Sequence, residues 1–449
     1  MERKIISGIF GLCFADAVGV PFEFRSRESL AHSPATGMCG YGTYNQPPGT
    51  WSDDTTMTLC LLDSLSNGLD YTDIMQRFLS WLKDAKYTPH NEVFDVGRTS
   101  REAISRFAKG VPPLLCGGAS EHDNGNGSLM RILPLVFYLH SRFGQDFFEN
   151  EEAVTAIHNI SALTHAHKRS QIACGIYLSI AAMLLGGTQL KYAFNLGVSR
   201  AWRYYSEHTE YTGELKHYER IHAPDFAAIP ENQIKSSGYV VDTLESALWC
   251  LLNTDSYEAC ILKAVNLGED TDTTAAVAGG LAGMYYGYDA IPKRWREKIA
   301  KNEYITGLCT AFYNSLNQIG FEKISAYISY FDTIDAKSVC RWKGGEARGD
   351  GSYTMPYAVY EDSLLQFMDD VSNSGLIDYA YMETFQKYGL AMNDGLAKQI
   401  ETADLPLTKA ILTCYIRQER FCKGLWGTAV KEGIFLALLK RLKTLLAES

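Results

Sequence analysis

The segment LGEDTDTTAAVAGG, residues 267–280, joins a cluster of acids to a run of small residues. Glu269, Asp270 and Asp272 lie within four positions, and residues that suit a tightly packed helix follow them directly. Like charges this close raise one another's pKa unless a positive charge lies between them. The segment therefore predicts a buried helix whose N-terminus either is capped by solvated acids or holds a cation.

A second segment, GTWSDDTTMTLCLL at residues 49–62, repeats this design. Ser52, Asp53 and Asp54 precede another helical pattern. Ser and Asp are good N-caps, and acids in a first turn suit the helix dipole, so capping alone explains one such cluster. A cap needs only one oxygen, however. Two clusters with surplus carboxylates favour a bound cation, which offsets their repulsion.

The residue types in the two clusters indicate which cation. Carboxylate and hydroxyl oxygens suit Mg²⁺, Mn²⁺ or Ca²⁺ and disfavour zinc. An EF-hand is excluded because, with Asp270 in position 1, Ala275 occupies position 6 and Leu281 position 12. The four aspartates of the clusters would nearly neutralise two divalent ions. A paired-metal site with ions roughly 3.5–4 Å apart is the natural inference.

The motif DTDTT, residues 270–274, also fits the Asp-x-Asp-x-Thr pattern of haloacid-dehalogenase-type phosphatases. Those enzymes carry it at the end of an apolar strand, usually early in an α/β domain. Here the preceding segment is helical in pattern and the motif comes late in the chain, which counts against that interpretation.

Three further segments carry candidate chemistry. In FADAVGVPFEF (14–24), Gly19 and Pro21 predict a helix end, and Glu23 between two Phe is either a proton-transfer group of raised pKa or an ordinary surface acid. In NGNGSLMRILPL (124–135), the N–H groups of Gly127 and Ser128 form either a plain turn or a phosphate cradle. In ALTHAHKRSQIACG (162–175), His165 precedes a buried helix, as a structural residue or as a donor to phosphate or ribose oxygens.

The helical pattern extends through most of the 449 residues. We predict an all-α catalytic domain at residues 1–322, and a small, mainly helical domain of unknown role at residues 323–449. The segment RWKGGEARGDGSYTMPY (341–357) reads as a Gly-rich polar loop within the second domain.

The bulk numbers restrict the class of protein. A net charge of -10 argues against general nucleic-acid binding and against binding to an anionic membrane. The longest apolar stretch, residues 172–185, is shorter than the ~20 residues that a bilayer needs. Eleven scattered cysteines without Cys-x-x-Cys spacing indicate reduced thiols, so we expect a cytoplasmic protein.

Together, these segments resemble the ADP-ribosylglycohydrolase family, which includes the dinitrogenase reductase-activating glycohydrolases. The combination of SDDT with DTDT at this separation is the most specific match. The resemblance covers about residues 5–297 and runs in order through GLCFADAVGVPFEF, WSDDTTM, GNGSLMRILPL, THAHKRS, SSGYVVDTLESALWCLL, AVNLGEDTDTTAAVAGGLAGMYYG and IPKRW.

This resemblance implies an all-α fold with two Mg²⁺ or Mn²⁺ ions in a central cleft. It implies metal ligation by Ser52, Asp53, Asp54, Asp270, Asp272 and Thr273, catalytic roles for Glu23 and Asp272, and an ADP-ribose site lined by Gly127, Ser128 and His165. One departure is Glu269, which stands where the family often has Gly. This additional acid would either alter metal affinity or point to solvent.

The implied activity is hydrolysis of the glycosidic bond at C1″ of ADP-ribose, with release of ADP-ribose. The substrate would be an ADP-ribosylated protein or a small-molecule ADP-ribose conjugate. The alternative is a catalytically inactive ADP-ribose-binding or structural protein that retains the fold. The presence of all four Asp and Glu23 favours an enzyme. The acceptor, the choice of metal, the oligomeric state and the role of the second domain stay open.

Overall fold

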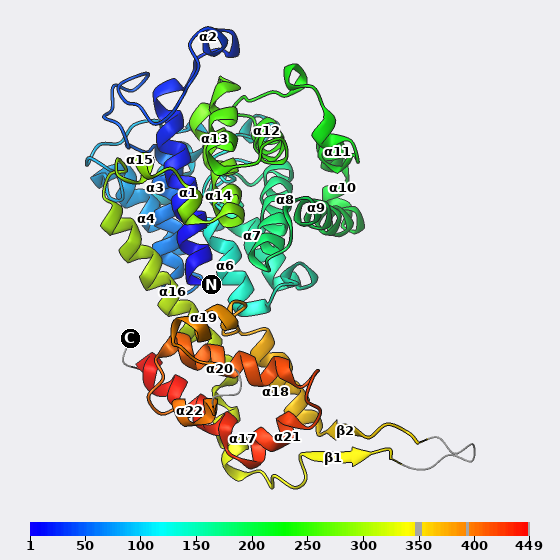
Figure 1. The fold of residues 1–449 in the computed structure, drawn as a ribbon. Helices are drawn as coiled ribbons and strands as arrows, with labels where there is room; N and C mark the ends of the chain where they lie inside the picture. The colour runs from blue at the N-terminus through cyan, green and yellow to red at the C-terminus, as the bar shows by residue number, and fades with distance from the viewer. Residues whose placement is uncertain (346–352, 392–394, 448–449) are drawn as a thin grey trace. The chain divides into compact units, whose positions relative to one another are not determined.

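The protein, seen in a computed structural model, divides into two units (Figure 1). The structure describes residues 1–345, 353–391 and 395–447. Unit 1 comprises residues 1–139 and 145–313, and unit 2 comprises residues 140–144 and 314–449. Each unit is described by itself below.

Unit 1 is built from α-helices, and its short 3₁₀ segments include η1 (Val20–Phe22). Its helices are α1 (Glu2–Gly19), α2 (Arg27–His32), α3 (Asp53–Leu65), α4 (Tyr71–Asp84), α5 (Arg98–Ala108), α6 (Pro134–Phe143), α7 (Glu151–Ala162), α8 (Lys168–Leu185), α9 (Leu190–Glu207), α10 (Thr209–Leu215), α11 (Glu219–His222), α12 (Val240–Leu252), α13 (Tyr257–Asn266), α14 (Thr271–Tyr286), α15 (Lys293–Arg296) and α16 (Asn302–Ser325). The division into units falls within α6 and α16.

The small residues of α14 let its backbone pack directly against α1, which lies beside it in Figure 1. A Cβ atom built on Gly11 would lie 2.4 Å from the carbonyl oxygen of Gly279. One built on Gly19 would lie 2.4 Å from the Cα atom of Asp272. Neither position has room for a side chain. The glycines therefore place the end of α1 against the first turn of α14, where the acids are.

Two long apolar helices form the centre of unit 1. All residues of α8 from Arg169 to Leu185 are buried, as the sequence predicted for this segment. The helical stretch Glu2–Phe22 is long and apolar enough to cross a membrane, but 94% of its apolar window is buried inside the protein. That burial is the behaviour of a core helix in a globular fold.

Among the described residues, unit 2 packs helices α17 to α22 and the end of α16 around an apolar core that includes Phe331, Phe367 and Phe435. The helices are α17 (Tyr327–Thr333), α18 (Asp362–Ser372), α19 (Tyr381–Lys387), α20 (Leu405–Gln418), α21 (Leu425–Lys431) and α22 (Ile434–Ala447). The predictions of an all-α first region and of a helical C-terminal region are thus confirmed.

The prediction of a loop over residues 341–357 was wrong at both ends, because residues 341–343 and 357 belong to strands. β1 (Cys340–Lys343) pairs antiparallel with β2 (Tyr357–Tyr360), with Arg341 opposite Val359. Aromatic and β-branched residues favour such short strands, a signal that the surrounding Gly residues obscured. Residues 346–352 of the predicted loop lie outside the described residues.

Candidate active site

The first acidic cluster forms the N-terminus of α3. Ser52 is the N-cap, and its Oγ accepts a hydrogen bond from the N–H of Asp54 at 3.3 Å. Asp16, from α1, accepts from the N–H groups of Ser52 and Thr55 and from the Thr55 hydroxyl at 2.6 Å. Asp16 thereby satisfies the first turn of α3. The carboxylates of Asp53 and Asp54 are therefore not needed to cap the first turn of α3.

The second cluster forms the N-terminus of α14. Asp270 is the N-cap residue, and its Oδ2 accepts a hydrogen bond from the side-chain amide of Asn126 at 2.8 Å. One oxygen of Asp272 accepts from the N–H of Thr273 at 2.9 Å. Within the described part of the chain, the remaining carboxylate oxygen of each aspartate has no hydrogen-bond partner.

The structure brings the two clusters together although they are far apart in sequence. The Thr273 hydroxyl donates to Oδ2 of Asp54 at 3.2 Å, across 219 residues of chain. Oδ2 of Asp54 also accepts from the Ser52 hydroxyl at 3.1 Å. The six residues for which metal ligation is predicted therefore lie at two adjoining helix N-termini, where the helix dipoles favour negative charge.

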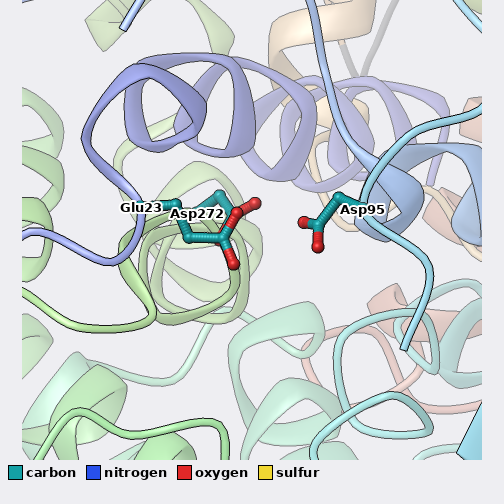
Figure 2. Close-up of side chains that lie close together, drawn as sticks. All are labelled: Glu23, Asp95 and Asp272. Atoms are coloured by element: carbon teal, nitrogen blue, oxygen red, sulfur yellow. The ribbon is translucent and has the colours of Figure 1, made fainter. Parts of the chain in front are cut away.

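A third group of acids adjoins them (Figure 2). One carboxylate oxygen from each of Glu23, Asp95 and Asp272 lies within 4.8 Å of the other two. Glu23 follows η1 and is buried, whereas Asp95 comes from the loop before α5 and is partly exposed. Glu23 and Asp95 contribute, after burial, to raising the pKa of the neighbouring Tyr44 hydroxyl. Three carboxylates from three parts of the chain thus surround one small space.

The burial of so many acids has a clear electrostatic effect. Burial raises the pKa of Glu23 to about 9, with a further contribution from Asp95. Burial, followed by repulsion from neighbouring carboxylates, raises the pKa values of Asp53, Asp54 and Asp272 well above their usual range. Carboxylates share a buried site at neutral pH only when a cation compensates them or when protons neutralise them.

The donor set fits a divalent metal. Among the described residues, none of these acids forms an ion pair with Lys or Arg. Buried oxygens without any hydrogen-bond partner remain on Glu23, Asp54, Asp270 and Asp272. Unpartnered buried carboxylate oxygens are costly in an apolar interior, and hard cations such as Mg²⁺ and Mn²⁺ prefer such ligands. Their role in metal binding stays a prediction.

The glycine-rich turn lies beside this cluster, because the Asn126 amide that bonds Asp270 belongs to it. In the described chain, no protein acceptor takes a hydrogen bond from the N–H groups of Gly127 or Ser128. The fully buried Arg131 donates to the carbonyl oxygen of Gly127. Free backbone N–H groups close to the buried guanidinium of Arg131 are suited to binding an anion. The Ser128 hydroxyl instead faces the core, where it accepts from Ser161 at 3.0 Å.

His165 is buried against the same turn. A Cβ atom built on Gly127 would lie 2.8 Å from the His165 ring, and Nδ1 of that ring lies 2.8 Å from the Thr164 hydroxyl. Burial, helped by the charge of Arg131, lowers the pKa of His165 to about 3. The ring is therefore neutral at physiological pH, and it lies at the turn, outside the group formed by Glu23, Asp95 and Asp272.

The extra acid Glu269 is exposed and has a left-handed backbone with φ of 62°. Glycine adopts this conformation without strain, which explains why glycine suits this position. The backbone N–H of Glu269 donates to the Arg25 carbonyl at 2.8 Å, and its own carbonyl accepts from Phe24 at 2.7 Å. Its contribution is therefore to hold the loop that carries Glu23.

Three residues at the site were missed or given no role by the sequence reasoning. Asp95 lies in an irregular loop without periodicity, so its place beside Glu23 is visible only in the structure. Asp16 could have been singled out as an acid in an otherwise apolar helical segment, just before Gly19. Arg131 lies within the quoted turn motif, and a lone Arg between apolar residues was the available signal.

Comparison with known proteins gives matches over both units. The model of the family described as ADP-ribosylglycohydrolase matches residues 1–319. A family of unknown function, DUF6508, matches residues 317–448. The two matches adjoin near the point at which the structure divides into its units.

Individual relatives match the first region. The chain is 30% identical over 312 residues to the ADP-ribosylarginine hydrolase Tri1 of Serratia proteamaculans (strain 568), with coverage of 69% of this chain and 79% of that protein. It is 33% identical over 303 residues to the ADP-ribosyl-dinitrogen reductase glycohydrolase of Rhodospirillum rubrum, with coverage of 67% and 91%. A solved structure of an ADP-ribosylglycohydrolase-related protein complex matches with a TM-score of 0.57 and 28% identity, over 70% of this chain and 98% of that one.

Proposed function

The chain belongs to the ADP-ribosylglycohydrolase family, and from this premise we propose that it hydrolyses the C1″ glycosidic bond of ADP-ribose linked to arginine. The observation that carries the proposal is the junction of the two acidic helix N-termini through the Thr273–Asp54 hydrogen bond, with unpartnered carboxylate oxygens on both sides. This concentration of buried negative charge supports a site built around divalent metal ions.

The residues proposed to hold two Mg²⁺ or Mn²⁺ ions are Ser52, Asp53, Asp54, Asp270, Asp272 and Thr273. When bound, such ions supply Lewis acidity that fixes ribose hydroxyls and polarises a water molecule. The negative charge of the surrounding carboxylates favours the oxocarbenium character of the transition state. The site thus combines substrate orientation with charge stabilisation.

Glu23 is the proposed proton-transfer group. In the reaction, the bond between C1″ and the leaving nitrogen breaks, and a bond forms between C1″ and a water oxygen. Glu23 gives a proton to the leaving guanidine nitrogen and regains one from the water that attacks C1″, so the products are ADP-ribose and arginine. Glu23 lies close enough to Asp272 for both to face one reacting bond.

Asp95 favours arginine as the acceptor. A guanidinium presents planar, paired N–H donors that match a carboxylate, whereas a serine oxygen offers none. Asp95 is partly exposed, comes from a loop and points toward Glu23 and Asp272 in Figure 2. This placement is consistent with the name of the Serratia proteamaculans relative, an ADP-ribosylarginine hydrolase.

The turn at Gly127 and Ser128 is proposed to bind the pyrophosphate. Its free N–H groups and the buried Arg131 offer positive potential next to Asn126, which contacts the metal cluster. His165 supports the turn as a neutral ring. Binding energy at the phosphates, remote from the scissile bond, then orients the ribose for reaction.

The test is a panel of substrates that differ only in linkage. The purified full chain is incubated with Mg²⁺ and with arginine-, serine- or nucleobase-linked ADP-ribose, and free ADP-ribose is quantified. The proposal expects release from the arginine conjugate in preference to the others. Release from none of them, together with tight binding of ADP-ribose, would establish the inactive binding protein instead.

A further inference from the structure

Unit 2 contains a cavity of about 360 Å³ that lies apart from the acidic residues of unit 1 in the chain. It is formed where the C-terminal end of α20 leads into α21, with a further wall from the segment between α18 and α19. Its volume is at the lower end of the range for small-molecule sites, which is enough for a single small ligand.

The cavity is cationic in an otherwise acidic protein. Arg417, Arg420 and Lys423 line it within seven positions of the chain. In the described residues, none of the three is engaged in an ion pair. Surface cations in a chain of net charge -10 usually have acids beside them, so three unpaired cations around one cavity create a local positive potential.

Glu419 is the acid among the residues that line the cavity, and its carboxylate binds backbone N–H groups. Glu419 is buried, and its two oxygens accept hydrogen bonds from the N–H groups of Gly424 at 2.9 Å and Trp426 at 3.1 Å. The hydroxyl of Tyr360 adds a further hydrogen bond to this carboxylate. Glu419 thus fixes the loop that carries Arg420 and Lys423, and its oxygens are already committed.

Two aromatic rings give the cavity flat walls. The indole N–H of Trp426 donates to the carbonyls of Tyr415 and Ile416 at 3.1 and 3.2 Å, which holds the ring in one orientation. The guanidinium of Arg417 lies 5.0 Å from the ring centroid of Tyr379. A planar apolar surface therefore stands next to cationic donors.

We propose that this cavity binds a mononucleotide, with its phosphate on Arg417, Arg420 and Lys423 and its base against Trp426 or Tyr379. Arginine forks and lysine ammonium groups are the usual phosphate donors, and aromatic faces stack on bases of any sequence. The size of the cavity selects one nucleotide over a strand. The assignment gives unit 2 a ligand of its own and is independent of the hydrolysis proposed for unit 1.

The experiment uses the full chain and adenosine monophosphate as the probe. Binding is measured by calorimetry, and its location is found by cross-linking with 8-azidoadenosine monophosphate followed by peptide mapping. Labelled peptides containing Tyr379 or Trp426 are the expected result. Adenosine and inorganic phosphate, each of which satisfies only half of the site, should bind at least about tenfold more weakly.

Charge reversal gives the matched comparison. Arg420→Glu should remove the cross-link at these peptides and weaken binding there by about tenfold or more, because it replaces a charge-assisted donor with a repulsive acid. Lys443→Glu, at an exposed position of α22, makes the same change in net charge and should leave binding intact. Both variants should retain hydrolysis by unit 1.

Three results would overturn the proposal. One is labelling confined to residues 1–313 with none at the cavity. Another is an equal loss of binding in Arg420→Glu and Lys443→Glu, which would show a non-specific charge effect. The third is equal affinity for inorganic phosphate and adenosine monophosphate, which would reduce the cavity to a simple anion site.

Discussion

The two units use charge in opposite ways. In unit 1, the carboxylates are mostly buried at helix N-termini, several of their oxygens lack a partner, and burial raises their pKa values. In unit 2, the cationic side chains around the cavity lie nearer the surface. The buried Glu419 beside them accepts hydrogen bonds from the N–H groups of Gly424 and Trp426. A buried, unsatisfied site needs its ion to be stable, whereas a solvated site only gains from its ligand.

The largest effect is expected when one carboxylate is removed from the buried cluster of unit 1. Asp272→Ala should reduce ADP-ribose release by about 10³-fold or more, because it deletes both a proposed metal ligand and a neighbour of Glu23. Asp255→Ala, an exposed acid before α13, is the matched control and should keep normal turnover. Near-normal turnover by Asp272→Ala would contradict the account.

A smaller effect is expected at the acid that faces the acceptor. Asp95→Asn should lower turnover of arginine-linked ADP-ribose by about 10²-fold, the usual range for a lost proton-transfer or charged hydrogen-bonding group. Hydrolysis of other linkages, where it is measurable, should change much less. If Asp95→Asn impaired all linkages equally, Asp95 would belong to the metal site and would not select the acceptor.

The buried cluster also predicts how stability depends on pH in protein stripped of metal. The pKa of Glu23 is raised from 4.5 to about 9, so the folded state binds more protons than the unfolded state between these values. The free energy of unfolding should therefore fall as pH rises from about 4.5 toward 9. Thermal melts in a chelator at several pH values measure this.

Added Mg²⁺ should reverse that trend, since cations bind the ionised acids. At a hundred times the dissociation constant, one bound ion stabilises the folded state by about 2.7 kcal/mol. The gain should grow with pH and should vanish in Asp272→Ala. Stabilisation by Mg²⁺ that was independent of pH and of Asp272 would place the ion elsewhere.

The smallest effect is expected at Glu419 of unit 2, whose carboxylate already accepts two backbone hydrogen bonds. Glu419→Gln puts an amide group against the N–H groups of Gly424 and Trp426, which should cost about 1–3 kcal/mol and lower the melting temperature of unit 2 by several degrees. Hydrolysis by unit 1 should be unchanged. An unaffected melting transition would show that water replaces these hydrogen bonds readily.

Much of unit 1 could be predicted from the sequence because its signals are local. The acids of 52–54 and 270–272 stand directly before helical patterns, so both their position and their N-terminal setting could be predicted. The family follows from the order of the same motifs, and the match over residues 1–319 confirms it.

The rest depends on contacts between distant segments. Asp95 joins Glu23 only because two loops meet, and the bond between Asp54 and Thr273 spans 219 residues. In unit 2, the cavity is lined by helix ends and by the loops that follow α18 and α20, which are not adjacent in the sequence. Hydrophobic periodicity cannot predict these tertiary contacts. It identifies the apolar face of a helix or strand, but it does not identify the segment against which that face packs.

The central claim is that the two acidic helix N-termini together hold a pair of divalent cations. Electron paramagnetic resonance of the full chain titrated with Mn²⁺ tests it most directly. The account predicts that two ions bind per chain with a spin-coupled spectrum, which is expected for ions roughly 3.5–4 Å apart, and that Asp272→Ala abolishes the coupling. A single uncoupled Mn²⁺ signal, or a coupled signal that persists in Asp272→Ala, would contradict it.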